Sequence, residues 1–249
     1  MAELLFSSGT PGEPDVQTTR TVGVHAVPLT VSRPAGDPPG AGVVLIQDAL
    51  GMAPPMVEAT RRLARQGYLV AAPHLYHRTT DDWFPDFGPA KSHMAKLNGD
   101  DLARDVADGR EYLDAAGIPA TAVGVVGFCM GGTISLWQAA SGDFAASVTF
   151  YGGGVAEGRW RGVPAGLESG AHLRCPWLGL YGDKDRSITV DQVEQLRLVA
   201  AETGMPTSIV RYANAGHAFA TDPEAATFVA DAAADSWARA IGWFDAHLR

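Results

Sequence analysis

The stretch Val123-Gly124-Val125-Val126-Gly127-Phe128-Cys129-Met130-Gly131-Gly132 decides the fold of this chain. Its β-branched start predicts a strand, and residues 133–140 after it predict a helix. A strand that turns this sharply into a helix leaves no room for side chains beside the central residue, and the glycines at 127 and 131 meet that need. The turn then holds Cys129 at the strand end, above the positive end of the helix dipole, where a thiolate is favoured.

Cys129 alone does not define a site, because a free cysteine is commonly a small buried apolar residue. Its partners decide. Residues 176–181 read as a buried strand that leads to Asp185, and residues 208–212 read as a short strand that leads to His217. A nucleophile, an acid and a histidine in this order, each on a loop after a strand, are typical of the α/β-hydrolase fold.

The rest of the chain alternates strands with helices. The expected strands are 21–32 (one or two edge strands), 42–47, 69–72, 123–126, 146–151, 176–181 and 208–212. The expected helices are 56–66, about 101–115, 133–140 and 190–202. A last helix is expected to start with Asp222 as N-cap and Pro223 at its first position. This pattern predicts an α/β fold with a mostly parallel central sheet and helices on both faces. Its ligand crevice should lie at the carboxyl ends of the strands.

Length and composition predict one folded unit. We expect residues 1–20 to form a loose N-terminal arm and residues 21–249 to form a single α/β-hydrolase domain, since 249 residues with 46% hydrophobic content bury a sizeable core. Residues 79–99 are polar and aromatic, which suggests an excursion over the site. Residues 152–170 are rich in glycine and read as loop.

Charge and cysteine content exclude several classes of function. The 19 basic and 28 acidic residues give a net charge of −9, which disfavours nucleic-acid and anionic-membrane surfaces. Two cysteines make no disulfide framework, and the N-terminus shows neither a secretory leader nor an apolar run of spanning length. We therefore expect a cytoplasmic protein, monomeric or weakly homo-oligomeric, with no cofactor, no metal and a small-molecule partner.

Several blocks of the chain, from about residue 20 to its end, resemble the dienelactone hydrolase family of the α/β-hydrolase superfamily. The cysteine in the elbow is specific, because most α/β hydrolases place serine there. The blocks are Gln47-Asp48-Ala49-Leu50-Gly51, Pro73-His74-Leu75-Tyr76-His77-Arg78, Gly127-Phe128-Cys129-Met130-Gly131-Gly132, Phe150-Tyr151-Gly152, Gly182-Asp183-Lys184-Asp185 and Gly216-His217-Ala218-Phe219.

The resemblance implies hydrolysis of a lactone or ester by a Cys-His-Asp triad. Cys129 matches the family nucleophile, His217 the base and Asp185 the residue that orients the base. Asp183, two residues before Asp185, does not match the family acid. Asp48 stands where the family has a glutamate that contacts the resting thiol, and its side chain is one methylene shorter.

The family also holds the carboxylate of its substrate with two arginines. By the resemblance, Arg78 matches the first of them, and Thr221 stands in place of the second. Because a bidentate arginine clamp is a strong recognition element, its loss indicates a different or less acidic substrate.

The residue types also specify the chemistry. His217 must take the thiol proton, and Asp185 must hold the imidazole in the accepting tautomer. Attack on a carbonyl creates an oxyanion, for which this fold offers the backbone N–H groups of Met130 and Ala49. The thioester formed on Cys129 would then be released by water.

Other residues have two readings. Trp83, Phe84 and Phe87 either line the site as an apolar lid or pack their loop down. Tyr151 either points into the site or packs in the core. Three residues are expected to take no part in the chemistry: Cys175, read as buried, and His74 and His77, which lack a third ligand at metal spacing.

Two alternatives to a lactone hydrolase stay open. The first keeps the triad but assigns acyl transfer or hydrolysis of an uncharged ester. The second is a non-catalytic ligand-binding protein that retains the α/β-hydrolase fold. The second class would be expected to lose a triad residue, and none is missing here.

Overall fold

The computed structural model describes residues 3–7, 15–36, 39–80 and 83–249. Within them, nine strands form one sheet in the order β1-β2-β3-β5-β4-β6-β7-β8-β9. The strands are β1 (Glu3–Ser7), β2 (Val16–Val22), β3 (Pro28–Pro34), β4 (Gly42–Ile46), β5 (Leu69–Pro73), β6 (Val123–Phe128), β7 (Ala146–Phe150), β8 (Trp177–Gly182) and β9 (Thr207–Tyr212). The helices are α1 (Pro54–Arg65), α2 (Phe87–Met94), α3 (Gly99–Ala115), α4 (Met130–Ala139), α5 (Gly166–Gly170), α6 (Val190–Ala201) and α7 (Ala230–Leu248), with a 3₁₀ turn, η1 (Ala120–Ala122), before β6.

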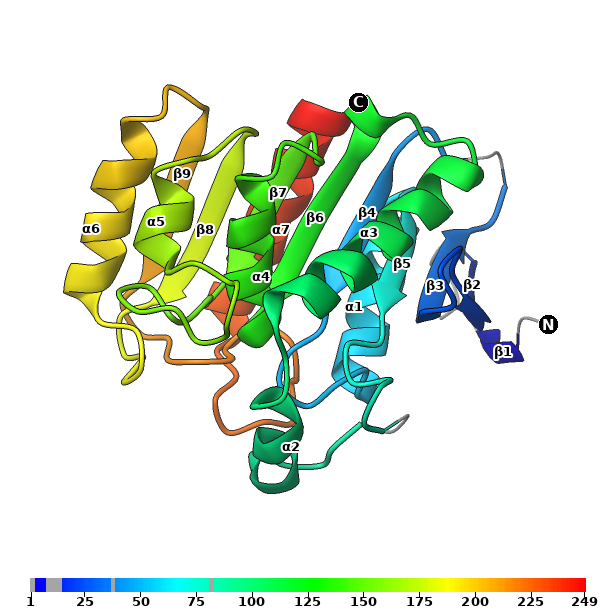
Figure 1. Cartoon of the computed structure of the whole chain (residues 1–249), viewed down its shortest axis with the longest axis horizontal. Helices are drawn as coiled ribbons and strands as arrows, with labels where there is room; N and C mark the ends of the chain where they lie inside the picture. Colours follow the sequence, from blue (N-terminus) through cyan, green and yellow to red (C-terminus); the bar gives the residue numbers. More distant parts are fainter. Residues whose placement is uncertain (1–2, 8–14, 37–38, 81–82) are drawn as a thin grey trace.

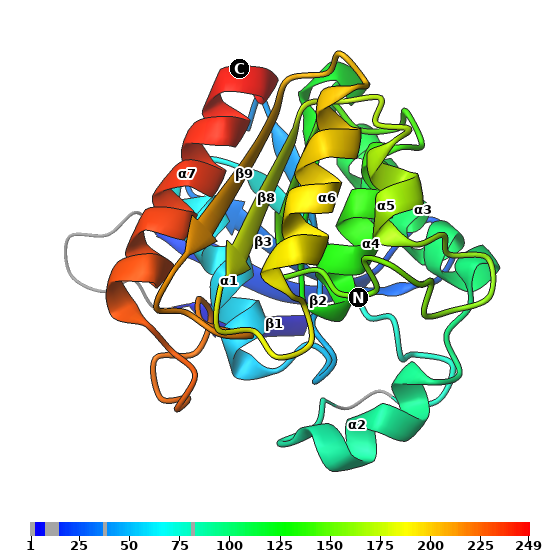
Figure 2. The same ribbon diagram turned by 90° about the vertical axis from the view of Figure 1, so that its left-hand side faces the viewer.

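The predicted fold class is confirmed. Strands β4 to β9 pair in parallel, whereas β1, β2 and β3 form an antiparallel extension that joins β5. Helices α1 and α7 cover one face, and α3, α4, α5 and α6 cover the other (Figures 1 and 2). The loops after β4, β6, β8 and β9 consequently meet at one edge of the sheet.

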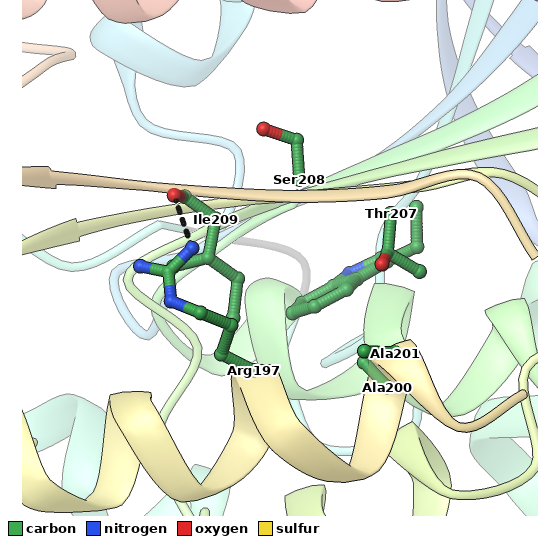
Figure 3. A pocket seen from close by; sticks show the side chains of 7 residues that line it. Arg197, Ala200, Ala201, Thr207, Ser208 and Ile209 are labelled. Atoms are coloured by element: carbon green, nitrogen blue, oxygen red, sulfur yellow. Dashed lines mark hydrogen bonds between the residues drawn. The ribbon is translucent and has the colours of Figure 1, made fainter.

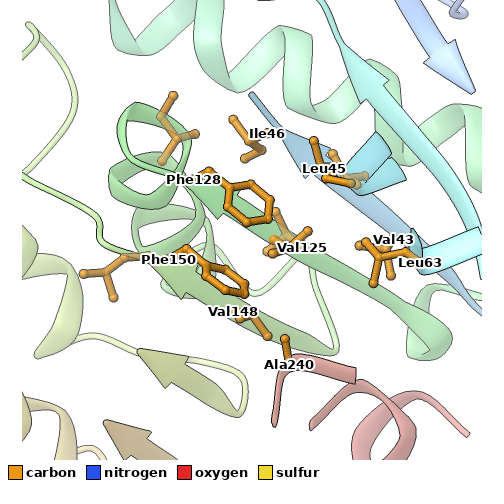
Figure 4. Packing of buried hydrophobic residues seen from close by; sticks show 14 of the residues in the cluster. Val43, Leu45, Ile46, Leu63, Val125, Phe128, Val148, Phe150 and Ala240 are labelled. Atoms are coloured by element: carbon orange, nitrogen blue, oxygen red, sulfur yellow. The ribbon is translucent and has the colours of Figure 1, made fainter. Parts of the chain in front are cut away.

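The central strands are buried on both faces. Every residue of β4, β5, β6, β7 and β8 is buried, which explains why β4, β5, β6 and β8 carry no alternating polar residues. In β7, Ser147 and Thr149 are buried as well. Figure 4 shows Phe128 and Phe150 stacked beside Val125 and Val148, and the two rings lie 4.6 Å apart. This packing supports β6, the strand that carries the elbow.

The prediction of a loose arm over residues 1–20 is wrong for the part that the structure describes. Residues 3–7 form β1, and residues 16–20 belong to β2; residues 1, 2 and 8–14 lie outside the described residues. The buried face of β2 carries Thr18, whose hydroxyl bonds that of Ser32, and Ser32 in turn bonds Thr60. A strand that buries hydroxyls lacks the apolar alternation by which strands are recognised.

The predicted start of the last helix is also wrong. Asp222 and Pro223 lie in a turn region, where the Asp222 carboxylate accepts the N–H of Glu224, and α7 begins only at Ala230. An aspartate followed by proline suits a turn as well as a helix start. The predicted loop 152–170 contains the short helix α5.

The expected excursion over residues 79–99 contains α2. This helix projects beyond the carboxyl ends of the parallel strands (Figure 1). Its N-cap is Asp86, whose side chain accepts the N–H of Gly88. Within the described residues, no helix combines the length and the apolar character needed to cross a membrane.

Candidate active site

The elbow predicted at Cys129 is present. Cys129 joins β6 to α4 with φ 53° and ψ −108°, a conformation that L-residues rarely adopt. A Cβ atom at position 127 would overlap the carbonyl oxygen of Gly131, and one at position 131 would overlap that of Ile46. Backbone contacts therefore exclude side chains at both glycines, as the sequence predicted.

The three side chains of the predicted triad lie in contact. His217 Nε2 is 3.0 Å from Cys129 Sγ, and His217 Nδ1 is 2.6 Å from Asp185 Oδ2. Asp185 follows β8 and His217 follows β9, so neighbouring strands bring together residues from distant parts of the chain. Hydrogen-bond distances of this kind permit proton transfer from the thiol to the imidazole.

A turn fixes the Asp185 carboxylate. Its Oδ1 atom accepts the Ser187 N–H at 2.8 Å, the Ser187 hydroxyl at 2.7 Å and the Ile188 N–H at 3.2 Å, which leaves Oδ2 for His217. The side chain is 2% exposed. Asp185 is therefore held in one orientation, as the residue that orients an imidazole must be.

Electrostatics favour an ionised acid and a basic imidazole. Burial raises the pKa of Asp185, but its hydrogen bonds to His217 and Ser187 and the charge of His217 outweigh burial, so this pKa lies below its ordinary value. Burial lowers the pKa of His217, but hydrogen bonds to Asp185 and Cys129 and the charges of both outweigh it and raise the pKa to about 10. His217 is thus a strong acceptor for the thiol proton.

Two backbone N–H groups lie next to the elbow. Gly131 packs against the carbonyl groups of Ile46 and Gln47, so the start of α4 touches the loop that follows β4. Among the described residues, neither the Met130 N–H nor the Ala49 N–H donates a hydrogen bond. Free amides from these two elements are what an oxyanion needs.

Asp48 is largely buried beside the triad. Its Oδ1 atom accepts the N–H of Leu50 at 2.8 Å, and the hydrogen bonds of the described residues include none between Asp48 and Cys129. Burial raises the pKa of Asp48 to about 6, against the opposing effects of the Leu50 hydrogen bond and the charge of His217. Asp48 therefore lies close enough to His217 for their charges to interact.

Arg78 is engaged by helix α3. Its Nη1 and Nη2 atoms donate to the two carboxylate oxygens of Asp105 at 2.7 and 2.8 Å, and its Nε atom lies 3.6 Å from Asp101. The Asp105 side chain is 1% exposed, whereas that of Arg78 is 33% exposed. A substrate carboxylate would have to share this guanidinium with Asp105.

The aromatic candidates differ in position. Tyr151 is buried, and its ring centroid lies 5.2 Å from that of His217. Trp83 and Phe87 are 46% and 50% exposed. Phe84 packs against the rings of Tyr76 and His93 at 5.8 and 4.9 Å. Tyr151 thus borders the imidazole, and the excursion presents two apolar rings to solvent.

The remaining candidates have structural surroundings. His74 Nε2 lies 2.9 Å from the Thr30 hydroxyl, and His77 Nε2 lies 3.3 Å from Asp105. Cys175 is buried with its thiol directed at the Ala139 carbonyl, and burial raises its pKa to about 12. No group of three possible metal ligands occurs among the residues that the structure describes.

A small pocket lies at the outer strand, away from the triad. Trp177, Arg197, Ala200, Ala201, Thr207, Ser208 and Ile209 line it. Figure 3 shows Arg197 reaching from α6 to β9, where its Nη1 atom donates to the Ile209 carbonyl at 2.8 Å. This pocket lies at the start of β9, whereas His217 follows the end of that strand.

Comparison with known proteins decides the family. The model of the dienelactone hydrolase family matches residues 28–248. The chain belongs to the dienelactone hydrolase family. The match spans every element from β3 to α7, including the elbow and both loops that carry Asp185 and His217. The family match and the relatives described below show that this chain is a hydrolase that acts on esters or lactones.

Relatives and solved structures agree with this membership. The carboxymethylenebutenolidase of Rhodococcus opacus is 30% identical over 246 residues, which cover 96% of this chain and 94% of that protein. A crystal structure from Klebsiella pneumoniae, named "Putative Dienelactone Hydrolase", is 29% identical with a TM-score of 0.81 and covers 98% of this chain and 97% of that one. A dienelactone hydrolase-like phosphotriesterase from metagenomic libraries, 22% identical with a TM-score of 0.78 over 95% of this chain and 99% of its own, shares the fold.

Sequence reasoning missed three residues around the site of this dienelactone hydrolase family member. Ser187 donates to the Asp185 carboxylate, Asp105 pairs with Arg78, and the Tyr76 hydroxyl donates to the Ala49 carbonyl. Ser187 carries a signal, because an aspartate followed two residues later by serine favours a turn of this kind. Asp105 and Tyr76 act across the fold and leave no local pattern.

Proposed function

We propose that this chain hydrolyses a small ester or lactone with Cys129 as nucleophile, His217 as general base and Asp185 as the residue that orients His217. The observation that carries the proposal is the pair of contacts at His217, 3.0 Å to the thiol and 2.6 Å to the carboxylate. Such a chain of contacts prepares a thiol for attack on a carbonyl carbon.

The reaction proceeds in two halves. Cys129 Sγ attacks the carbonyl carbon as its proton passes to His217, and the oxyanion that forms is stabilised by the N–H groups of Met130 and Ala49. Collapse breaks the C–O bond, and His217 returns the proton to the leaving alkoxide. Water then attacks the thioester with His217 as base, which releases the acid and regenerates the thiol.

The surroundings suggest how substrate is held. Arg78, Tyr151 and Trp83 are the proposed substrate-binding residues. Asp105 already compensates the charge of Arg78, which supports a substrate of low charge. This fits the alternative in which the substrate is an uncharged ester.

Two free cysteines suit a reducing compartment such as the cytoplasm. Recovery of the native chain from a secreted fraction would contradict that location.

Alkylation of the thiols tests the proposal. Iodoacetamide should label Cys129 before Cys175, because Cys129 contacts a base whereas burial keeps the Cys175 thiol protonated. Hydrolysis of a p-nitrophenyl ester should fall in step with labelling. Mass spectrometry of the labelled peptides, taken with residual activity, measures both. Full labelling of Cys129 with undiminished turnover would instead favour another nucleophile, whereas absence of turnover in the unlabelled protein would favour the ligand-binding alternative.

Acyl transfer needs a separate measurement. If added alcohols or thiols accelerate release of p-nitrophenol and collect the acyl group in place of water, then the chain is a transferase that uses the same triad. Product analysis by chromatography distinguishes the two, and formation of the free acid alone would leave hydrolysis as the activity.

We propose that Asp48 modulates the thiol through its charge. In Asp48→Asn, the pH profile of Cys129 alkylation should move to lower pH, because removal of a nearby anion favours the thiolate. The inflection near pH 6 that arises from Asp48 itself should disappear. Asparagine keeps an oxygen for the Leu50 N–H, so the loop is retained. A profile identical to that of the unmodified chain would refute the role of Asp48.

Arg78→Ala tests recognition of a substrate carboxylate. The ratio of kcat/KM for an acidic lactone to that for a neutral lactone should fall by about tenfold or less, a modest loss because Asp105 already pairs with the guanidinium. Because Arg78→Ala also leaves the Asp105 carboxylate unpaired, and this charge would repel the acidic lactone alone, the ratio is compared with that of the double variant Arg78→Ala/Asp105→Asn. An unchanged ratio would exclude Arg78 from recognition of the acid.

A further inference from the structure

The loop after β4 is held by three hydrogen bonds that surround Ala49. The Gly51 N–H donates to the Asp48 carbonyl at 3.2 Å, and the Leu50 N–H donates to the Asp48 carboxylate at 2.8 Å. The Tyr76 hydroxyl donates to the Ala49 carbonyl at 3.0 Å. Both peptide groups that flank Ala49 are therefore fixed, and the N–H of Ala49 is left without an acceptor among the described residues.

Tyr76 is the member of this set that comes from another strand. It follows β5 and is 3% exposed. Its hydroxyl also lies 3.4 Å from Met130 Sδ, so one oxygen atom contacts both residues whose N–H groups are the proposed oxyanion donors. Burial raises the pKa of Tyr76, and the hydroxyl accordingly stays protonated as a donor.

The ring of Tyr76 is fixed by the excursion that carries α2. Phe84 and His93 pack against it with ring centroids 5.8 and 6.1 Å away. His93 is itself held by the Thr79 hydroxyl at 2.8 Å, and the Phe84 N–H donates to the Leu50 carbonyl at 2.8 Å. The excursion thus contacts the loop after β4 directly and through Tyr76.

We propose that Tyr76 is a positioning residue, whose hydroxyl fixes the Ala49–Leu50 peptide group and thereby keeps the Ala49 N–H, in the preceding peptide group, pointed at the oxyanion. This inference rests on the proposed function. A donor that is set in place before the reaction stabilises the transition state without reorganisation, whereas a donor on a loose loop does not. The ring contacts with Phe84 and His93 keep the hydroxyl in reach of the Ala49 carbonyl.

Tyr76→Phe tests the role of the hydroxyl, because it keeps the ring and its packing. We expect kcat for a p-nitrophenyl ester to fall about 10- to 100-fold, less than the roughly 10²- to 10³-fold typical of losing a whole oxyanion donor, with little change in KM because the oxyanion exists only beyond the ground state. Iodoacetamide should alkylate Cys129 at the rate found for the unmodified chain, since that displacement forms no oxyanion.

Tyr68→Phe is the matched control. Tyr68 is equally buried, and its hydroxyl donates to Asp245 at 2.7 Å at the far end of the sheet. It should therefore lose a comparable hydrogen bond without loss of kcat. If Tyr76→Phe keeps kcat within twofold of the unmodified chain, the proposal is overturned. It is also overturned if alkylation slows in parallel with kcat, since Tyr76 would then act on the thiol.

Hydrogen exchange separates this inference from the proposed function. Amides of residues 50 and 51 should exchange several-fold faster in Tyr76→Phe than in the unmodified chain and in Tyr68→Phe, because the loop loses the bond to the Ala49 carbonyl. This measurement does not depend on turnover. Absence of ester hydrolysis by the unmodified chain would refute the proposed function alone, whereas unchanged exchange at these amides would refute the role of Tyr76.

Discussion

Replacing Asp185 with asparagine is expected to lower kcat for ester hydrolysis by about 10⁴-fold, the loss typical when the acid of such a triad becomes an amide. An asparagine nitrogen facing Nδ1 of His217 is a donor, so the imidazole would adopt the tautomer that carries its proton on Nε2. That nitrogen could then no longer accept the thiol proton of Cys129, 3.0 Å away.

The change is isosteric, so folding should survive it. The Ser187 and Ile188 donors still find the side-chain oxygen of asparagine. Asp183→Asn is the control, because Asp183 lies two residues away but pairs with Arg211 at 2.7 and 3.0 Å and does not contact His217. Steady-state kinetics of both variants decide the assignment, and a large loss confined to Asp183→Asn would transfer the acid role to that residue.

The same substitution should change how His217 titrates. In the unmodified chain, contacts with Asp185 and Cys129 raise the pKa of His217 to about 10 in spite of burial. Without the Asp185 charge, less opposes the lowering effect of burial, so the pKa of His217 should fall. NMR titration of the imidazole measures the change, and a pKa that stays near 10 would show that Asp185 does not sustain the basicity of His217.

Gly131→Ala is expected to disrupt both stability and turnover. A Cβ at this position would overlap the Ile46 carbonyl oxygen and would lie 2.5 Å from that of Gln47. Both are backbone atoms of a central strand and its end, which cannot yield as a flexible side chain can. We expect the free energy of unfolding to fall by about 1–3 kcal/mol, the usual cost of overpacking.

In Gly131→Ala, kcat should fall even for the protein that remains folded. The elbow would have to move away from β4, which separates the Met130 N–H from the Ala49 N–H, and removing one oxyanion donor costs about 10²- to 10³-fold in rate. Gly242→Ala is the control, because an added Cβ there meets open space on helix α7, where alanine favours the helix. Denaturant unfolding and ester kinetics measure both effects, and a Gly131→Ala protein equal to Gly242→Ala in both would contradict the account.

The residues that were predictable from sequence are those whose role depends on local chain geometry. Cys129 lies between two glycines, and Asp185 and His217 each follow an apolar strand, so parallel pairing alone brings them to one edge. Residues that contact the site through ring packing or ion pairs give no comparable local pattern in the sequence. Asp105 lies on α3 and meets Arg78 only because that helix packs on β5.

The errors in the fold have comparable causes. Strand β2 buries the hydroxyls of Thr18 and its partners, so its hydrophobic pattern is weak although its pairing with β3 runs over seven residues. Asp222 and Pro223 carry a helix-start signature that the chain uses for a turn. In both places, local preference is compatible with two structures, and contacts that are distant in sequence select between them.

The contact between Arg197 and β9 bears on how copies of this chain meet. The carbonyls of Pro206 and Tyr212 face β8, and since carbonyls alternate along a strand, that of Ile209 faces outward. Arg197 already occupies it with a charged donor. A second copy that added its own strand to this edge would first have to displace the guanidinium from the Ile209 carbonyl. Breaking that charge-assisted hydrogen bond costs free energy that pairing with an unoccupied strand edge would not.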